Sequence, residues 1–143
     1  MTDRTVSATW NGSLLEGSGT IHAAGSGAFG PLPVTWASRA EEPAGKTSPE
    51  ELLAAAHAAC YSMALSHGLA QNGTPPEQLD TSATVTFQPG EGITRVALEV
   101  EGRVPGLDAD AFQRAAQTAK ENCPVSKALA AVPEITLEAR LAP

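Results

Sequence analysis

Two cysteines, Cys60 and Cys123, are the residues of this chain best suited to covalent chemistry. Cys60 lies in the middle of an alanine-rich apolar segment, whereas Cys123 stands directly before Pro124. A thiol on a dry helix and a second thiol at the start of another helix can act as attacker and resolver in redox chemistry. Two such cysteines can equally be inert, because buried cysteine is common in protein cores. The elements that carry them have to separate the two interpretations.

The electrostatic surroundings of the two thiols predict different acidities. Burial in apolar surroundings raises the pKa of a thiol, so a reactive Cys60 needs a nearby cation. The basic residues just upstream of its helix are Arg39 and Lys46, and we expect Arg39 at the end of a strand. Cys123 is expected at a helix N-cap because the following proline disfavours helical dihedral angles, and a helix N-terminus favours its thiolate. Local electrostatics alone therefore indicate Cys123 as the more acidic thiol.

Histidines offer a second kind of chemistry near Cys60. One predicted helical stripe holds His57, Cys60, Ala64 and His67. A Cys–His nucleophile or a two-ligand metal site could be built from His57 and Cys60, which are one turn apart. His57 and His67 are separated by about 15 Å along a helix, too far to bind one ion together. A hydrogen-bonded interior histidine is favoured for both, and the cysteine spacing matches no zinc pattern, so we predict no metal and no cofactor.

The composition argues against several classes of function. The 143 residues carry a formal net charge of −7 and no cluster of Lys or Arg, which disfavours nucleic acid and anionic membrane surfaces as partners. The N-terminus has no secretory h-region, and the longest apolar stretch, residues 52–65, is too short to span a bilayer. We therefore expect a cytoplasmic protein with a single domain over residues 1–143. In the cytosol a disulfide is usually transient and catalytic.

The N-terminal third is predicted as strands and turns, with strands over residues 5–10, 17–22 and 33–39. At Ser48 the pattern changes to that of a long helix. Ser48 is a suitable N-cap, and Glu51 is expected to complete a capping box with it. Glycines and prolines after residue 67 are expected to end this helix. Because its middle is apolar on all sides, we predict a central, buried helix.

The second half alternates strands and helices. The expected elements are strands over 82–87 and 93–102, a helix over 109–122 capped by Asp108, a short helix over 124–130 and a closing strand over 134–141. The first two of these strands alternate polar and apolar residues, so each is expected to show one face to water. This order of elements predicts an α+β fold.

Glu50 is explained in the first place by its position in the first turn of the long helix, where a carboxylate is favoured. Ten residues separate Glu50 from Cys60, which is about 15 Å along the helix axis, so Glu50 cannot touch its own Cys60. If two copies of the alanine-rich helix packed antiparallel about a twofold axis, Glu50 of one chain would approach Cys60 of the other. This hypothesis makes a homodimer part of the active site.

The segments around both cysteines resemble those of a known family. Residues 48–65, around Cys60, closely resemble the signature of the osmotically inducible protein C (OsmC/Ohr) family of thiol peroxidases. Residues 119–129, around Cys123, resemble the family's resolving-cysteine segment, and residues 104–108 resemble the entry to its second helix. The Ohr branch carries an arginine roughly where residues 17–19 stand here, and none occurs there, which favours the OsmC branch.

The resemblance implies an antioxidant enzyme that reduces organic hydroperoxides and hydrogen peroxide in oxidative or osmotic stress. It implies Cys60 as the peroxidatic cysteine and Cys123 as the resolving one, with Arg39 stabilising the thiolate and Glu50 orienting Arg39. The implied fold is an intertwined homodimer in which antiparallel sheets wrap two central helices, with both active sites at the interface. The implied partners are a peroxide substrate and an external dithiol reductant, for which a lipoyl dithiol is the family expectation.

The resemblance reverses the roles that local electrostatics suggest for the two thiols. We accept the reversal because contact with Arg39 can outweigh the fractional charge of a helix dipole. Two other interpretations stay open. One is a non-redox, ligand-binding or structural dimer in which the cysteines are packed and inert. The other is a Cys–His acyl-transfer enzyme using Cys60 and His57, for which no orienting third group or oxyanion-hole motif is evident.

Overall fold

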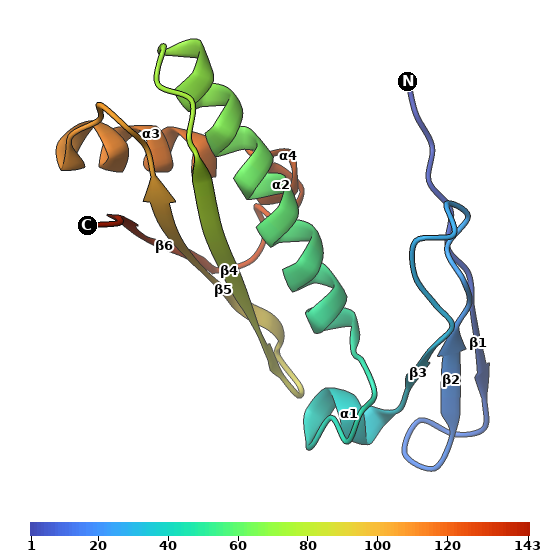
Figure 1. Ribbon diagram of the computed structural model, residues 1–143. Coiled ribbons are helices and arrows are strands. Elements are labelled where there is room, and N and C mark those ends of the chain that lie inside the picture. The colour runs from blue at the N-terminus through green and yellow to red at the C-terminus, as the bar shows by residue number, and fades with distance from the viewer. The chain divides into compact units, whose positions relative to one another are not determined.

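The computed structural model describes residues 1–143, which form two compact units, Met1–Leu52 and Leu53–Pro143. Figure 1 labels the helices and strands of both units. Each unit contains one three-stranded sheet. None of the helices combines the length and the apolar character that crossing a membrane requires.

The first unit is built on an antiparallel sheet in the order β1-β2-β3. These strands are Ala8–Asn11, Ser18–Ile21 and Leu32–Val34. Gly19 in β2 pairs with both neighbouring strands, and a side chain there would approach Trp10 to 2.7 Å and Val34 to 3.0 Å. The three strands predicted for the N-terminal third are present, but the third is shorter than residues 33–39.

Arg39 lies on a short helix and not at the end of a strand, so that prediction is wrong. Helix α1 (Trp36–Ala40) begins with a capping box, in which the Ser38 N–H donates to Thr35 Oγ1 and the Thr35 N–H donates to Ser38 Oγ. Both of these hydrogen bonds are 3.0 Å long. They satisfy backbone donors that need a partner wherever a helix starts.

Helix α2 (Pro49–Gln71) starts as predicted, because the Glu51 N–H donates to Ser48 Oγ at 3.1 Å. The predicted capping box is only half formed, since the Glu51 carboxylate accepts a 2.7 Å hydrogen bond from Thr47 Oγ1 instead. The helix runs beyond its expected end and stops close to Gly73. Gly73 has a positive φ of 83°, which suits a residue just past a helix terminus.

The second unit holds a sheet of β4 (Gln78–Gln88), β5 (Gly92–Arg103) and β6 (Glu134–Leu141). β4 and β5 are antiparallel, but β6 pairs parallel to β5, which corrects the expectation of purely antiparallel sheets. A parallel neighbour requires a crossover connection, and α3 (Ala109–Asn122) and α4 (Pro124–Ala128) provide it. The α+β class is confirmed.

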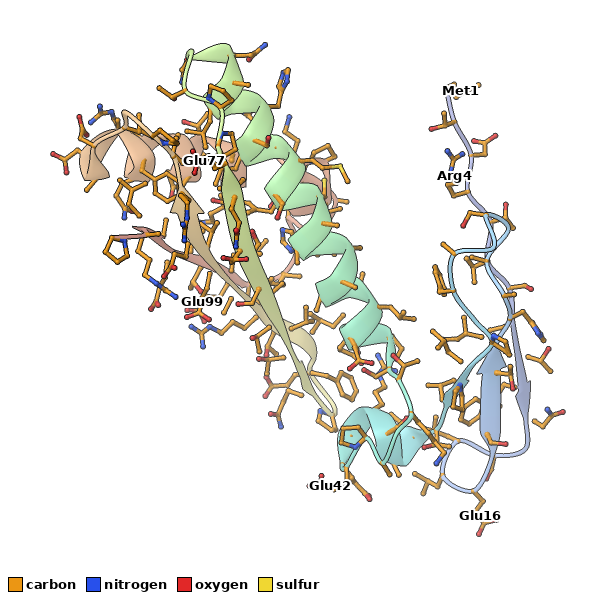
Figure 2. All side chains as sticks on the ribbon, in the orientation of Figure 1. Met1, Arg4, Glu16, Glu42, Glu77 and Glu99 are labelled. Atoms are coloured by element: carbon orange, nitrogen blue, oxygen red, sulfur yellow. The ribbon has the colours of Figure 1, made fainter.

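One face of α2 builds the core of the second unit. Its buried side chains pack in one cluster with buried residues of β5: Tyr61, Leu65 and Leu69 with Val96, Leu98 and Val100. Glu99, between them on β5, is exposed and points away from α2 (Figure 2). The opposite face of α2 is not buried within one chain, since Met63 is 70% exposed and the alanines nearby are exposed as well. The all-round burial expected for this helix is therefore not reached in a single chain.

Helix α3 is anchored at its N-terminal end. Asp108 caps it as predicted, accepting a 2.8 Å hydrogen bond from the Ala111 N–H. The buried Phe112 packs directly on the backbone of β5, where a Cβ on Gly102 would come within 2.6 Å of the Phe112 ring. This close packing sets the position of the other end of α3, where Cys123 follows.

Candidate active site

The second unit brings the two cysteines together. Cys60 lies on α2 and Cys123 at the junction of α3 and α4, and both are free thiols. Their side chains lie within hydrogen-bonding reach of each other. Cys123 is fully buried, whereas Cys60 is partly exposed. A partly exposed thiol can meet a substrate, while the buried thiol beside it is shielded from solvent.

The backbone holds Cys123 between two helices. Its N–H donates to the Ala119 carbonyl at 2.8 Å, at the end of α3, and its carbonyl accepts from the Lys127 N–H at 3.0 Å, in the first turn of α4. Cys123 is the N-cap of α4, as predicted from the proline that follows it. The N–H groups of Val125 and Ser126 consequently point toward the thiols.

These surroundings separate the acidities of the two thiols. Burial raises the pKa of the Cys60 thiol and the Cys123 sulfur raises it further, while a hydrogen bond from the Val125 N–H opposes both. Burial also acts to raise the pKa of Cys123. Hydrogen bonding from the Ser126 N–H, the Cys60 thiol and the Ser126 hydroxyl outweighs burial and leaves the pKa of Cys123 lowered. The prediction from local electrostatics is confirmed, and a nucleophilic Cys60 needs an added cation.

His57 and Ser126 form a buried pair that sequence reasoning missed. His57 Nε2 lies 2.8 Å from Ser126 Oγ, and His57 Nδ1 has no hydrogen-bond partner. Burial lowers the pKa of His57, so its imidazole is neutral at neutral pH. Neither ring nitrogen bonds to Cys60, so the Cys–His nucleophile is not assembled. The interior position expected for both histidines holds for the fully buried His57 and is wrong for His67, which is exposed.

In the first unit, the other two predicted site residues, Arg39 and Glu50, form an ion pair. Arg39 Nη2 donates to Glu50 Oε1 at 2.8 Å, and Arg39 Nε donates to the two carboxylate oxygens at 3.0 and 3.2 Å. Glu50 is buried, and the Arg39 side chain keeps 31% exposure. Ser38 Oγ donates to the Thr47 carbonyl at 2.8 Å and so ties α1 to the start of α2. The paired hydrogen bonds fix the plane of the guanidinium.

A hollow of about 370 Å³ lies beside Arg39. Its other lining residues are Trp10, Leu14, Val34, Thr35, Trp36 and Pro49. Leu14 is 56% exposed and stands at the surface of this hollow. A mostly apolar wall with one guanidinium suits a ligand that has an organic group and a polar end. No group of three or more His, Cys, Asp or Glu side chains is arranged to hold a metal ion.

Known proteins place the chain in a family. The family model described as OsmC-like protein matches residues 42–138. The chain is also 44% identical over 137 residues to peroxiredoxin OsmC of Escherichia coli K12, across 94% of this chain and 93% of the relative. The chain belongs to the OsmC-like family. The match to the OsmC-like family model includes Glu50, Cys60 and Cys123 and begins after Arg39.

Solved structures agree with the fold of this OsmC-like chain. The OsmC like protein of Mycoplasma pneumoniae has a TM-score of 0.73 at 17% identity and covers 99% of each chain. The organic hydroperoxide resistance protein OhrB of Bacillus subtilis has a TM-score of 0.66 at 25% identity, over 96% of this chain and 98% of that one. The predicted OsmC-like fold class is therefore confirmed.

Proposed function

We propose that this OsmC-like chain is a thiol peroxidase that reduces organic hydroperoxides and hydrogen peroxide, with Cys60 as the attacking thiol and Cys123 as the resolving thiol. Membership of a family whose curated relative is named a peroxiredoxin supports a cysteine-based peroxidase. The observation that carries the assignment of roles is the thiol pair itself. It joins a partly exposed cysteine on α2 to a buried, more acidic cysteine within hydrogen-bonding reach.

The proposed cycle balances in three steps. The Cys60 thiolate attacks the terminal peroxide oxygen, the O–O bond breaks, and the leaving alkoxide takes a proton to depart as alcohol, which leaves Cys60 as sulfenic acid. The Cys123 thiolate then attacks the Cys60 sulfur, and hydroxide leaves as the disulfide forms. An external dithiol returns two electrons and two protons by thiol–disulfide exchange. We assign the dithiol to the lipoyl class.

Arg39 and Glu50 complete this proposal. Burial raises the pKa of Cys60, so a guanidinium is needed to stabilise its thiolate. Ten residues of helix place Glu50 about 15 Å along the axis from Cys60 of the same chain. We therefore assign this role to Arg39 and Glu50 of a second chain in a homodimer. The exposed alanine face of α2 favours such a dimer, because small side chains let two helices approach closely.

One equivalent of tert-butyl hydroperoxide added to the reduced protein tests the function. We expect a single disulfide between Cys60 and Cys123, seen as the loss of two hydrogens in the intact mass and located by peptide mapping. The Cys123→Ser protein, treated in parallel, should gain one oxygen instead. If both thiols remain free after the peroxide is added, the cysteines are packed and inert, and the chain acts as a non-redox dimer.

The hollow beside Arg39 leads to a prediction on substrate preference. Leu14→Ser removes apolar wall from that hollow, so we expect kcat/KM for cumene hydroperoxide to fall about fivefold, equivalent to ~1 kcal/mol of lost apolar contact. The value for hydrogen peroxide should stay the same. Leu15→Ser is the matched control, since Leu15 is the next residue, is 74% exposed and does not line the hollow. Equal effects on both peroxides would show that the hollow does not hold the organic group.

A further inference from the structure

His57 is a fully buried side chain that has no role in the proposed cycle. Its Nε2 lies 2.8 Å from the hydroxyl of Ser126, which is buried on α4. Cys123 is the N-cap of α4, and Ser126 is the third residue after it. Hydrogen bonds from the Ser126 hydroxyl and N–H also reach the Cys123 thiol, so Ser126 links the His57 ring to that sulfur.

The direction of the hydrogen bonds follows from the unpartnered His57 Nδ1. A hydroxyl has one hydrogen to donate. If Ser126 donated it to His57 Nε2, the ring proton would sit on Nδ1, leaving a buried N–H without an acceptor. Buried N–H groups without partners are rarer than bare acceptors. The favoured arrangement has His57 Nε2–H donating to Ser126 Oγ, which frees the Ser126 hydrogen for the Cys123 sulfur.

We propose that His57 and Ser126 are positioning residues for the resolving cysteine, forming a hydrogen-bond chain from His57 Nε2–H through Ser126 Oγ–H that stabilises the Cys123 thiolate and aims it at Cys60. This inference rests on the proposed thiol peroxidase function and deepens it. The Cys123 proton leaves before the attack and hydroxide departs from the Cys60 sulfenic acid. His57 and Ser126 therefore only donate hydrogen bonds and are unchanged by the cycle.

The groups around Cys123 agree with this role. Burial acts to raise the pKa of Cys123, and the hydrogen bonds from Ser126 are among the interactions that lower it. The titratable side chains near it on α2 are Cys60 and Tyr61, with His57 behind Ser126. The Tyr61 hydroxyl donates to the Ala116 carbonyl at 2.9 Å and is thus committed elsewhere. No Lys, Arg, Asp or Glu contributes to the lowered pKa of Cys123. Ser126 is therefore the residue through which His57 can act on this thiol.

Single-turnover kinetics of the full-length protein test the inference. After one equivalent of tert-butyl hydroperoxide, quenched samples separate formation of the Cys60 sulfenic acid from formation of the disulfide. Ser126→Ala and His57→Leu should slow disulfide formation about tenfold, the low end for a lost hydrogen bond to a charged group. Both should leave sulfenic acid formation unchanged and raise the alkylation midpoint of Cys123. Ser62→Ala is the control. The Ser62 hydroxyl forms its hydrogen bonds with the Ala58 carbonyl and with Thr81 Oγ1, and with neither cysteine.

His57→Gln separates hydrogen-bond donation from packing. A glutamine amide offers an N–H donor near the position of Nε2, so disulfide formation should recover to within about threefold of the unmodified protein. If Ser126→Ala resolves at the unmodified rate with an unchanged Cys123 alkylation profile, the pair only packs α4 on α2 and the inference is overturned, whether or not His57→Leu folds. If the unmodified protein itself forms no disulfide, the proposed function fails instead.

Discussion

Replacing Cys60 with serine is expected to abolish peroxide turnover, with a loss of roughly 1,000-fold or more. A serine hydroxyl is not ionised at neutral pH and cannot accept oxygen as sulfur does, so no sulfenic acid forms. Consumption of tert-butyl hydroperoxide in the presence of a dithiol measures the effect. The small change of side chain on a partly exposed helix position should leave the fold intact.

Cys123→Ser is the matched variant for this experiment. It should consume one equivalent of peroxide and then stop or overoxidise, because the Cys60 sulfenic acid has no partner within reach. A sulfenic-acid trap should label Cys60 in this protein. Because the pKa of Cys123 is lowered, the alternative to be tested is that Cys123 attacks the peroxide and Cys60 resolves it. Should Cys60→Ser consume one equivalent and Cys123→Ser none, the roles of attacker and resolver are exchanged.

Arg39→Ala is expected to lower activity at pH 7 by about 10- to 100-fold, because loss of the guanidinium raises the pKa of Cys60 further and leaves less of the reactive thiolate. Burial already raises the pKa of Cys60, and a guanidinium favours the charged thiolate. Removing that cation moves the alkylation midpoint of Cys60 upward, so the lost activity should return as the pH rises toward the new midpoint. Alkylation rate against pH, measured in the Cys123→Ser background, gives this value directly.

Lys46→Ala is the control for Arg39→Ala. Both cations lie just upstream of α2, and both were candidates for stabilising the Cys60 thiolate. The carboxylate of the buried Glu50 holds Arg39, whereas no ion pair holds Lys46, so only Arg39 is fixed for such a role. An unchanged Cys60 profile in Arg39→Ala, or an equal shift in Lys46→Ala, would remove Arg39 from the site.

The local chemistry of the chain could be predicted wherever a short motif determines the backbone. Ser48 and Asp108 start helices, and Cys123 becomes an N-cap because Pro124 follows it. The lowered pKa of Cys123 follows from the same local geometry. These features depend on neighbours within a few residues, and sequence displays such neighbours directly.

The remaining features depend on contacts that the sequence does not display. The apolar alternation before Arg39 predicted a strand, but the segment forms a helix that starts at the Thr35–Ser38 capping box. Ser126 is close to Cys123 in the sequence, yet its partner His57 is 69 residues away. The parallel pairing of β6 also escaped prediction, because strand direction is set by the crossover and not by strand composition.

The parallel crossover has a thermodynamic consequence for the oxidised protein. Because the chain returns from β5 to β6 through α3 and α4, Cys123 lies far along the sequence from Cys60. A covalent bond between them would close a ring that contains β4, β5 and α3. Closing a ring of that size lowers the conformational entropy of the unfolded chain, which stabilises the folded state by about 4 kcal/mol. Peroxide would thus leave the enzyme more resistant to heat until a dithiol opens the ring again.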